Sequence, residues 1–224
     1  MKCDLHIHTY YSYDSTSSPK EIVQAALKKG IDCLAITDHD RIEGAIEVAK
    51  YAKDKQILII PGIEIKSRQG DILALNVKEI IPNKLSAKET IKRIKQAGGM
   101  AVIAHPFGLF CSFKGGLKDL SKEVDGIEVL NASIFALANN KALRFAKKNN
   151  LAFTAGSDAH FPEFVGRVYL EIPGENLSAE QVLKTIRNKN VKMGGKETGL
   201  FEKIIDHIKR TFAKIDYYAR PKKR

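Results

Sequence analysis

Histidines and acidic residues recur at the ends of short apolar segments in this chain. Five of its six histidines have this position, together with several carboxylates and one amide. In order along the chain these residues are His6, His8, Asp38, His39, Asp40, Glu64, His105, Asn131, Asp158 and His160. Neutral imidazoles combined with carboxylates are suitable ligands for zinc, manganese or iron. The pattern predicts a metal centre if the fold brings these segment ends together.

The spacing within the clusters supports shared ligation. Successive side chains of a strand point to opposite faces, so His6 and His8 share a face and can bind one ion. Asp158 and His160 repeat this spacing. The two oxygens of Glu64 can bridge two ions about 3.5 to 4 Å apart, as can those of Asp158, and such a pair of ions serves hydrolysis.

Each of these residues also has a simpler explanation. Asp38 and Asp40 are placed to cap a helix that follows them. Glu64 can pair with a nearby surface lysine, and Asn131 can serve a turn. His207 lies on the polar side of the last helix, where we expect it to be solvated. The joint occurrence of five histidines and two carboxylates at segment ends favours the metal centre.

The apolar segments have the length and composition of strands. They cover residues 3–7, 33–36, 57–60, 72–77, 101–104, 127–130, 151–154 and 168–172. Most are continuously apolar and alternate with helical patterns, which is typical of parallel strands covered on both faces. This indicates an α/β barrel or a doubly wound sheet. In a parallel barrel the carboxyl ends of all strands open on one face, where such enzymes have their sites.

Capping signals separate these strands. Capping boxes begin at Ser18, Ser86 and Ser178, and each predicts a helix. Apolar residues at helical spacing predict two further helices, over residues 42–49 and 134–146.

A final helix is predicted over residues 200–215, because its apolar residues fall on one face. They are Ile204, Ile205, Ile208, Phe212 and Ile215. The segment 190–224 carries ten basic and four acidic residues, more than half of the formal net charge of +11. This excess favours an anionic partner. Nucleic acid bound by the basic tail is one interpretation, and a solvated basic helix is the other.

Composition limits the class of protein. With 224 residues, 44% hydrophobic and 28% charged, the chain suits one large globular domain and excludes a disordered or fibrous protein. Its apolar stretches are too short to cross a bilayer. Polar residues near the N-terminus argue against a secretory signal, and the three cysteines are sparse. We therefore expect a soluble, cytoplasmic protein without a membrane partner.

Five ordered motifs carry a family resemblance. They are His6-Ile-His-Thr-Tyr-Tyr-Ser-Tyr-Asp14, Thr37-Asp-His-Asp40, Pro61-Gly-Ile-Glu64, Ala104-His-Pro106 and Gly156-Ser-Asp-Ala-His160. The chain resembles the polymerase and histidinol phosphatase (PHP) family over residues 1–175. The resemblance implies a distorted (β/α)7 TIM-like barrel over residues 1–199, then a C-terminal helix and basic tail over residues 200–224. It also implies two or three manganese, zinc or iron ions that support phosphoester hydrolysis.

The resemblance assigns the metal ligands to three groups. The first consists of His6, His8, Glu64 and Asp158. The second uses Glu64, His105 and the residue at position 131, and the third uses Asp14, His39 and His160. Many members with three ions have histidine where this chain has Asp14 and Asn131. Because asparagine is a weak ligand, the second ion would be bound more loosely, and the number of ions stays open between two and three.

The implied reaction is attack of a metal-activated hydroxide on phosphorus. Asp158 would orient or deprotonate the water, and His160 would protonate the leaving alkoxide if no third ion is bound. Asn131 and basic residues near the motifs are candidates for binding the anionic phosphorylated substrate. The basic candidates are Lys66, Arg68, Lys114 and Arg167.

Several functions remain open at this stage. Small stand-alone members of the family act on nucleoside monophosphates, 3′,5′-bisphosphates or RNA 5′ ends, and histidinol phosphate is another substrate in the family. Strand-end histidines also serve amidohydrolases and deaminases, so C–N bond hydrolysis is a second hypothesis. A metal-binding module that docks on nucleic acid through the basic tail is a third. The sequence does not predict an oligomeric state.

Overall fold

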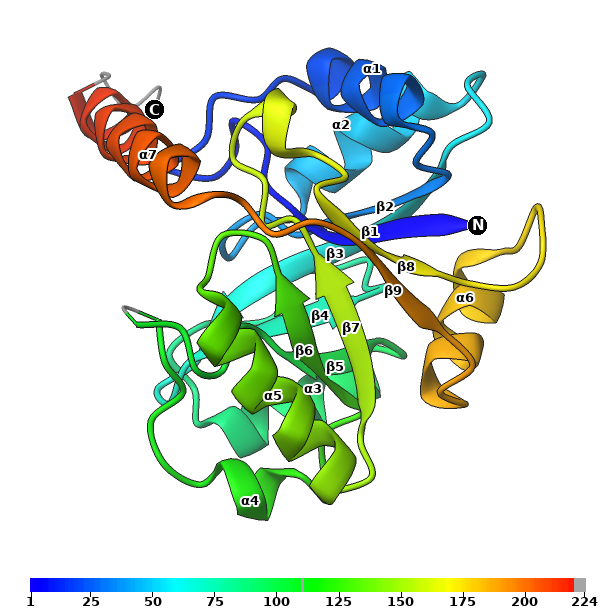
Figure 1. Cartoon of the computed structure of the whole chain (residues 1–224), viewed down its shortest axis with the longest axis vertical. Coiled ribbons are helices and arrows are strands. Elements are labelled where there is room, and N and C mark those ends of the chain that lie inside the picture. Colours follow the sequence, from blue (N-terminus) through cyan, green and yellow to red (C-terminus); the bar gives the residue numbers. More distant parts are fainter. Residues whose placement is uncertain (110, 220–224) are drawn as a thin grey trace.

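One mixed sheet organises the molecule. The computed structural model describes residues 1–109 and 111–219, within which nine strands join in this sheet (Figure 1). The strands are β1 (Lys2–Ile7), β2 (Cys33–Ile36), β3 (Leu58–Lys66), β4 (Asp71–Leu75), β5 (Met100–Ile103), β6 (Gly126–Asn131), β7 (Ala152–Gly156), β8 (Val168–Glu171) and β9 (Lys192–Gly195). Each apolar segment that predicted a strand overlaps one of them. The sequence analysis missed β9, whose Lys-Met-Gly-Gly sequence lacks apolar alternation.

The strand directions correct the expectation of an all-parallel core. The order is β7-β6-β5-β4-β3-β2-β1-β8-β9. The strands β1, β2 and β3 are parallel, as are β5, β6 and β7, whereas β4 is antiparallel to both neighbours. A short turn joins β3 to β4, in which the Ser67 amide donates to the Gly70 carbonyl at 3.0 Å. So short a connection can only join antiparallel strands, because a parallel pair needs a longer crossover.

The sheet curls into a nearly closed barrel because the chain after β7 returns to β1. The Asp158 amide donates to the His6 carbonyl at 2.8 Å, and the His8 amide donates to the Ala159 carbonyl at 2.9 Å. Gly156 allows this approach, since a Cβ atom there would lie 2.4 Å from the His6 Cβ atom. The first and last sequence motifs, with His6 and His8 in one and Asp158 and His160 in the other, thereby lie side by side.

Six of the seven helices in the described residues lie where the sequence predicts them. The helices are α1 (Pro19–Lys29), α2 (Glu43–Ala52), α3 (Ala87–Gln96), α4 (Leu117–Leu120), α5 (Ala136–Lys148), α6 (Ala179–Arg187) and α7 (Leu200–Ala219), with a 3-10 turn, η1, at Pro162–Phe164. The short α4 was not predicted. Complete capping boxes begin α1 at Ser18 and α6 at Ser178. At α3 the box is only half formed. Ser86 accepts from the Glu89 amide, but the Glu89 carboxylate pairs with Arg93 at 2.7 Å.

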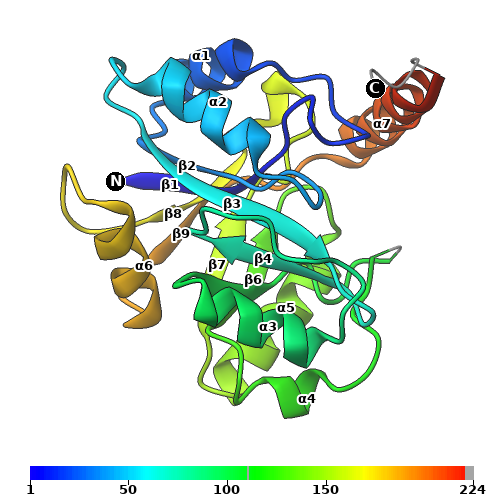
Figure 2. The same cartoon turned by 180° about the vertical axis from the view of Figure 1, so that it is seen from behind.

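Two apolar clusters hold these layers together. One packs α1, α2, α3 and α5 against the strands. The other joins strand residues such as Leu5 and Leu73 to Val182, Leu183 and Ile186 of α6. The helices α6 and α7 lie on opposite sides of the molecule (Figures 1 and 2). None of the helices in the described ranges is long and apolar enough to cross a membrane.

The last helix has an unexpected orientation. The predicted helix is present and extends to Ala219, but its predicted apolar face points away from the barrel. Its buried residues are Asp206 and Ala213, whereas Phe212 is 68% exposed. A polar face of α7 therefore packs against the barrel. The basic end of the chain, residues 220–224, lies outside the described residues.

Candidate metal centre

The predicted ligands meet at one mouth of the barrel. His6 is near the end of β1, with His8 just after it, and Glu64 lies in the last part of β3. The other ligands follow the strands β2, β5 and β7; they are His39, His105, Asp158 and His160. The side chains of His6, His8 and His160 are fully buried, and Glu64 is 2% exposed. Strand ends more than 150 residues apart in the chain thus form one polar cluster within the molecule.

Two strand irregularities help to direct these side chains inward. Three residue steps of β1, from Asp4 to Ile7, lie opposite two steps of β2. A similar register shift occurs in β6 between Glu128 and Leu130. Such bulges change the direction of neighbouring side chains, and they are common beside functional sites. Asp158 also has a left-handed backbone, with φ of 53°, which aspartate tolerates better than most residues.

Four side chains form the first group of potential ligands. The Nε2 atoms of His6 and His8 lie 3.5 and 3.4 Å from Glu64 Oε2. The same two nitrogens lie 3.7 and 3.4 Å from Asp158 Oδ1. A tetrahedral ion with ligand distances of about 2.1 Å has ligands about 3.4 Å apart. The group therefore has the dimensions of a cage for one ion.

The second group shares Glu64 with the first. His105 Nε2 lies 2.9 Å from Glu64 Oε1, the other oxygen of the carboxylate. The donor atoms of His6, Glu64 and His105 are all within 4.8 Å of one another. Because the two oxygens of Glu64 face different groups, this carboxylate has the geometry of a bridge.

The third group lies nearer the surface. Asp14 Oδ1 is 3.3 Å from the Nε2 atoms of both His39 and His160. The donor atoms of His8, His39 and His160 also lie within 4.8 Å of one another. The Asp14 and His39 side chains are 14% and 20% exposed, so this group borders the opening of the mouth.

The hydrogen bonds of the histidines direct their lone pairs into the cluster. His6 Nδ1 lies 3.0 Å from Glu128 Oε1, and His160 Nδ1 lies 3.0 Å from the Asp158 carbonyl. A carboxylate and a carbonyl accept hydrogen bonds, so Nδ1 carries the proton in each neutral ring. The Nε2 atoms of His6, His8 and His160 have no hydrogen-bond partner although they are buried. Buried polar atoms are normally paired, and these fit a divalent cation.

Asp38 orients His8 through a hydrogen bond to Ser12. Ser12 Oγ donates to Asp38 at 2.7 Å and lies 3.0 Å from His8 Nδ1, from which it accepts. Asp38 also accepts from the Thr9 amide at 2.7 Å. Its side chain therefore neither caps α2 nor joins a ligand group, because it is engaged in positioning His8. Asp40 instead accepts from the Lys66 amide and the Asn83 side chain.

Sequence analysis missed Glu128, a buried acid in the middle of β6. Its carboxylate binds the His6 ring, the His105 amide at 2.9 Å and the Asn131 side chain at 3.0 Å. One side chain thus orients three residues of the centre. The only signal was a charged residue within an otherwise apolar strand.

Asn131 has a positioning arrangement as well. Its Oδ1 accepts from the Ser133 amide at 2.9 Å, and its Nδ2 donates to Glu128 and, at 3.4 Å, to Asp158. The amide oxygen that would have to bind an ion is therefore engaged elsewhere. The structure places Asn131 between two carboxylates of the cluster.

The electrostatics of the cluster suit cation binding. Burial raises the pKa of Glu64, but the charges of His6 and His39 outweigh it and hold this pKa well below its usual value. The pKa of Asp158 is also well below its usual value, because Arg210 and then His6 overcome its burial. Burial, reinforced by His160 and His39, lowers the pKa of His8. Ionised carboxylates and a neutral His8 are the forms that bind metals. Burial lowers the pKa of His6, but Glu128 and Asp158 outweigh it and hold this pKa well above its usual value, so His6 would release a proton on metal binding.

Comparisons with known proteins agree with this geometry. An uncharacterized protein of Methanocaldococcus jannaschii is 41% identical over 142 residues, which cover 59% of this chain and 82% of that protein. Residues 136–191 match the PHP-associated family, PHP_C. A Bacteroides vulgatus two-domain protein containing a predicted PHP-like metal-dependent phosphoesterase superposes with a TM-score of 0.73 at 21% identity, covering 94% of this chain and 69% of that one. The chain belongs to the PHP family.

A further similarity concerns a shorter part of the chain. A 5′-3′ exoribonuclease of Haemophilus influenzae is 34% identical over 99 residues, which cover 42% of this chain and 36% of that enzyme. The nearly closed mixed sheet of this chain is the distorted TIM barrel of the PHP fold.

Three of the four basic residues that the sequence proposed for substrate binding are dispersed in this PHP protein. Arg68 Nε donates to the Lys84 carbonyl at 3.0 Å. Lys114 is exposed in the connection between β5 and α4, where its amide donates to the Gln69 carbonyl. Arg167 pairs with Glu202 and lies over the Phe164 ring. The structure does not bring these three cations together at the cluster.

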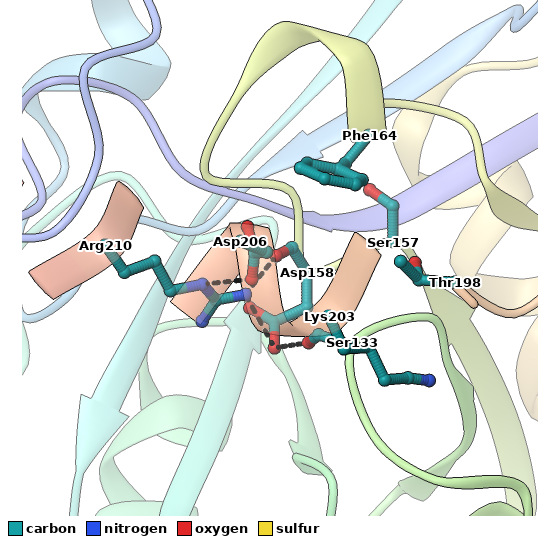
Figure 3. Close-up of a pocket in the computed structure, with 8 residues that line it drawn as sticks. All are labelled: Ser133, Ser157, Asp158, Phe164, Thr198, Lys203, Asp206 and Arg210. Carbon is teal, nitrogen blue, oxygen red and sulfur yellow. Dashed lines mark hydrogen bonds and ion pairs between the residues drawn. The ribbon is translucent and has the colours of Figure 1, made fainter. Parts of the chain in front are cut away.

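Arg210 of α7 is the cation that reaches the centre, and sequence analysis missed it. Its Nη2 atom donates to the Asp158 carbonyl at 3.0 Å and lies 3.8 Å from Asp158 Oδ2, while Nε pairs with Asp206 at 2.7 Å (Figure 3). A small pocket adjoins it, lined by Ser133, Ser157, Asp158, Phe164, Thr198, Lys203, Asp206 and Arg210. The polar face of α7 therefore forms one wall of the candidate site.

Proposed function

We propose that this PHP protein is a metal-dependent phosphoesterase that binds two or three manganese, zinc or iron ions. The observation that carries the proposal is the set of three overlapping ligand groups, which share His6 and His8 and are lined by buried, unpartnered Nε2 atoms. The names of the Bacteroides vulgatus and Haemophilus influenzae proteins support phosphoester chemistry.

Each ligand group would hold one ion. His6, His8, Glu64 and Asp158 would hold one ion, and His105 would hold a second together with Glu64. Asp14, His39 and His160 would hold a third. Bound divalent ions would supply Lewis-acid stabilisation of the phosphoryl oxygens and a water of lowered pKa.

The chain's own residues would then position the reactants. Asp158 Oδ1 faces His6 and His8, whereas its Oδ2 accepts from Ser133 and Asn131 beside Arg210, so this fixed carboxylate would orient a water near the reacting phosphorus. The Arg210 guanidinium would bind phosphoryl oxygens, for which its planar fork is suited. His160 has its Nδ1 proton directed at a carbonyl, so its Nε2 serves better as a ligand than as a proton donor.

Features of the mouth support a nucleotide-like substrate or an RNA 5′ end. The Tyr13 ring stacks on His39 with centroids 4.8 Å apart, and Lys214 lies over the same Tyr13 ring at 5.2 Å. Aromatic rings beside cations are the groups that bind single-stranded nucleotides through stacking and charge.

A substrate panel with metal analysis tests the proposal. The purified protein would be assayed with manganese and with zinc against nucleoside monophosphates, 3′,5′-bisphosphates, histidinol phosphate, 5′-phosphorylated short RNA and a set of amides and aminopurines. We expect phosphate release, at least two bound ions per chain by elemental analysis, and loss of turnover after chelation. Ammonia release without phosphate release would instead support C–N hydrolysis, and turnover that survives complete chelation would refute metal dependence.

The basic tail has its own test. Deleting residues 200–224 would also remove Arg210, so the informative truncation ends at Ala219. If the tail captures nucleic acid, the truncated chain binds RNA more weakly and with a smaller salt dependence, while it still hydrolyses a mononucleotide. Unchanged RNA binding would assign the tail to solvation alone.

A further inference from the structure

The outward face of α7 is a continuous apolar surface. We call it the outer stripe, and it consists of Leu200, Phe201, Ile204, Ile205, Ile208, Phe212, Ile215 and Tyr218. These side chains are between 36% and 74% exposed. The helix is 20 residues long, so the stripe runs along its whole length.

The area of the outer stripe is that of a protein interface. A large aromatic side chain has about 150 to 250 Å² of surface, so eight large residues at these exposures present on the order of 800 Å². Monomeric proteins seldom expose apolar patches of more than a few hundred Å². About 800 Å² per partner is the size of a standard stable interface.

The spacing of the stripe fits a second helix. Phe201, Ile204, Ile208, Ile215 and Tyr218 follow one another at steps of three, four, seven and three residues. These are the a and d positions of a heptad repeat, which pack as knobs into holes of a facing helix. A stripe of this kind is complementary to itself across a two-fold axis.

The basic residues of α7 distinguish a protein partner from a lipid surface. A helix that lies on a membrane has Lys and Arg beside its apolar face, directed outward to the headgroups. In α7, the described basic side chains contact the barrel or the inner face of the helix. Lys203 donates to the Ala132 and Ile134 carbonyls, Lys209 pairs with Glu163, Arg210 pairs with Asp206, and Lys214 lies over Tyr13.

We propose that the outer stripe is a homodimer interface, in which the α7 helices of two chains pack against each other. The pairing leaves the polar face of α7 on its own barrel. Dimer formation therefore buries the stripe and, resting on the proposed function, holds Arg210 against the metal centre.

The test measures mass against concentration for the full chain. Light scattering after gel filtration at micromolar concentration is expected to give twice the chain mass of 24.9 kDa. In the double variant Ile208→Glu with Phe212→Glu, we expect a monomer and a dissociation constant raised by at least roughly 10-fold, because each dimer would bury four carboxylates. Ile80→Glu is the matched control, since Ile80 is 54% exposed in a loop away from α7.

Circular dichroism would show that each variant is folded, and the milder Phe212→Ala variant serves if the double variant is not. A wild-type monomer at high micromolar concentration, or a dimer that persists in the stripe variants, overturns the proposal. Co-sedimentation of a monomeric wild type with phosphatidylserine vesicles, lost in the stripe variants, would assign the face to lipid. These readouts do not depend on activity, so they stand apart from the test of the proposed function.

Discussion

Helices α6 and α7 have the same amphipathic pattern and opposite orientations. In α6, the apolar residues Val182, Leu183 and Ile186 are almost fully buried against the strands. In α7, Ile215 is 60% exposed and the buried residues are Asp206 and Ala213. The difference shows that the surface a helix meets decides which of its faces turns inward.

The two surfaces differ in charge. The strands beneath α6 present apolar side chains such as Cys3, Leu5 and Leu170. The surface beneath α7 presents the Asp158 carbonyl and carboxylate at the edge of the ligand cluster. An apolar face there would remove the cation that compensates the buried Asp158 carboxylate, and the cost of burying an uncompensated charge favours Arg210.

The largest effect is expected when a negative charge is removed from the ligand cluster. Glu64→Gln retains the shape of the side chain but removes the bridging carboxylate. We expect turnover to fall on the order of 1,000-fold or more and the bound metal to decrease, as measured by phosphate release and elemental analysis. His207→Ala, an exposed change on α7, is the control and should keep full activity. Normal turnover in the Glu64 variant would reject its bridging role.

A second prediction compares the same substitution on the two helices. Ile186→Ala in α6 removes a fully buried side chain and should lower the free energy of unfolding by about 2 to 5 kcal/mol. Ile215→Ala in α7 should change it by no more than about 0.5 kcal/mol when the protein is dilute enough to be monomeric. Urea denaturation measures both. Equal losses would show that α7 buries its apolar face in solution and would contradict the observed orientation.

A third prediction separates substrate binding from metal binding. Arg210→Ala should lower kcat/KM by about 10- to 100-fold, because the lost guanidinium contacts are charge-assisted, while elemental analysis still finds the ions. Arg210→Lys should recover only part of the loss, since lysine keeps the charge but not the planar fork. A large loss of bound metal would instead show that Arg210 acts by holding Asp158 in place.

The ligand cluster could be predicted from the sequence because two simple rules locate it. Alternation along a strand places His6 and His8 on one face, and parallel strands gather their carboxyl ends at one mouth. Neither rule requires knowledge of contacts between residues that are distant in the sequence. The same rules failed for β4, because its direction depends on the short turn at Ser67 and Gly70 rather than on its apolar sequence.

The residues that support the cluster could not be found in this way. Arg210 lies 50 residues beyond the last motif, and its contact with Asp158 exists only because α7 turns its polar face inward. Glu128 has apolar neighbours on both sides in the sequence, and two of its partners, His6 and His105, come from distant parts of the chain. Conversely, Arg68 and Lys114 are close to motifs in sequence, but proximity along a loop does not fix the direction of a long, flexible side chain.

The smallest predicted effect concerns Glu128. It tests whether buried polar contacts matter within the barrel as they do beneath α7. Glu128 accepts from a ring nitrogen of His6, a backbone amide and the Asn131 amide group. In Glu128→Gln, one of the two oxygens becomes an amino group that faces a donor, so His6 or His105 loses part of its support. Metal affinity should fall by roughly 10-fold, the lower end for residues that orient metal ligands. Competition with a chelating dye measures this affinity.

Phe153→Leu, a partly buried apolar change on the neighbouring strand β7, is the control and should leave the metal affinity unchanged. If both variants lost metal equally, the effect would come from general loosening of the strands rather than from the orientation of His6.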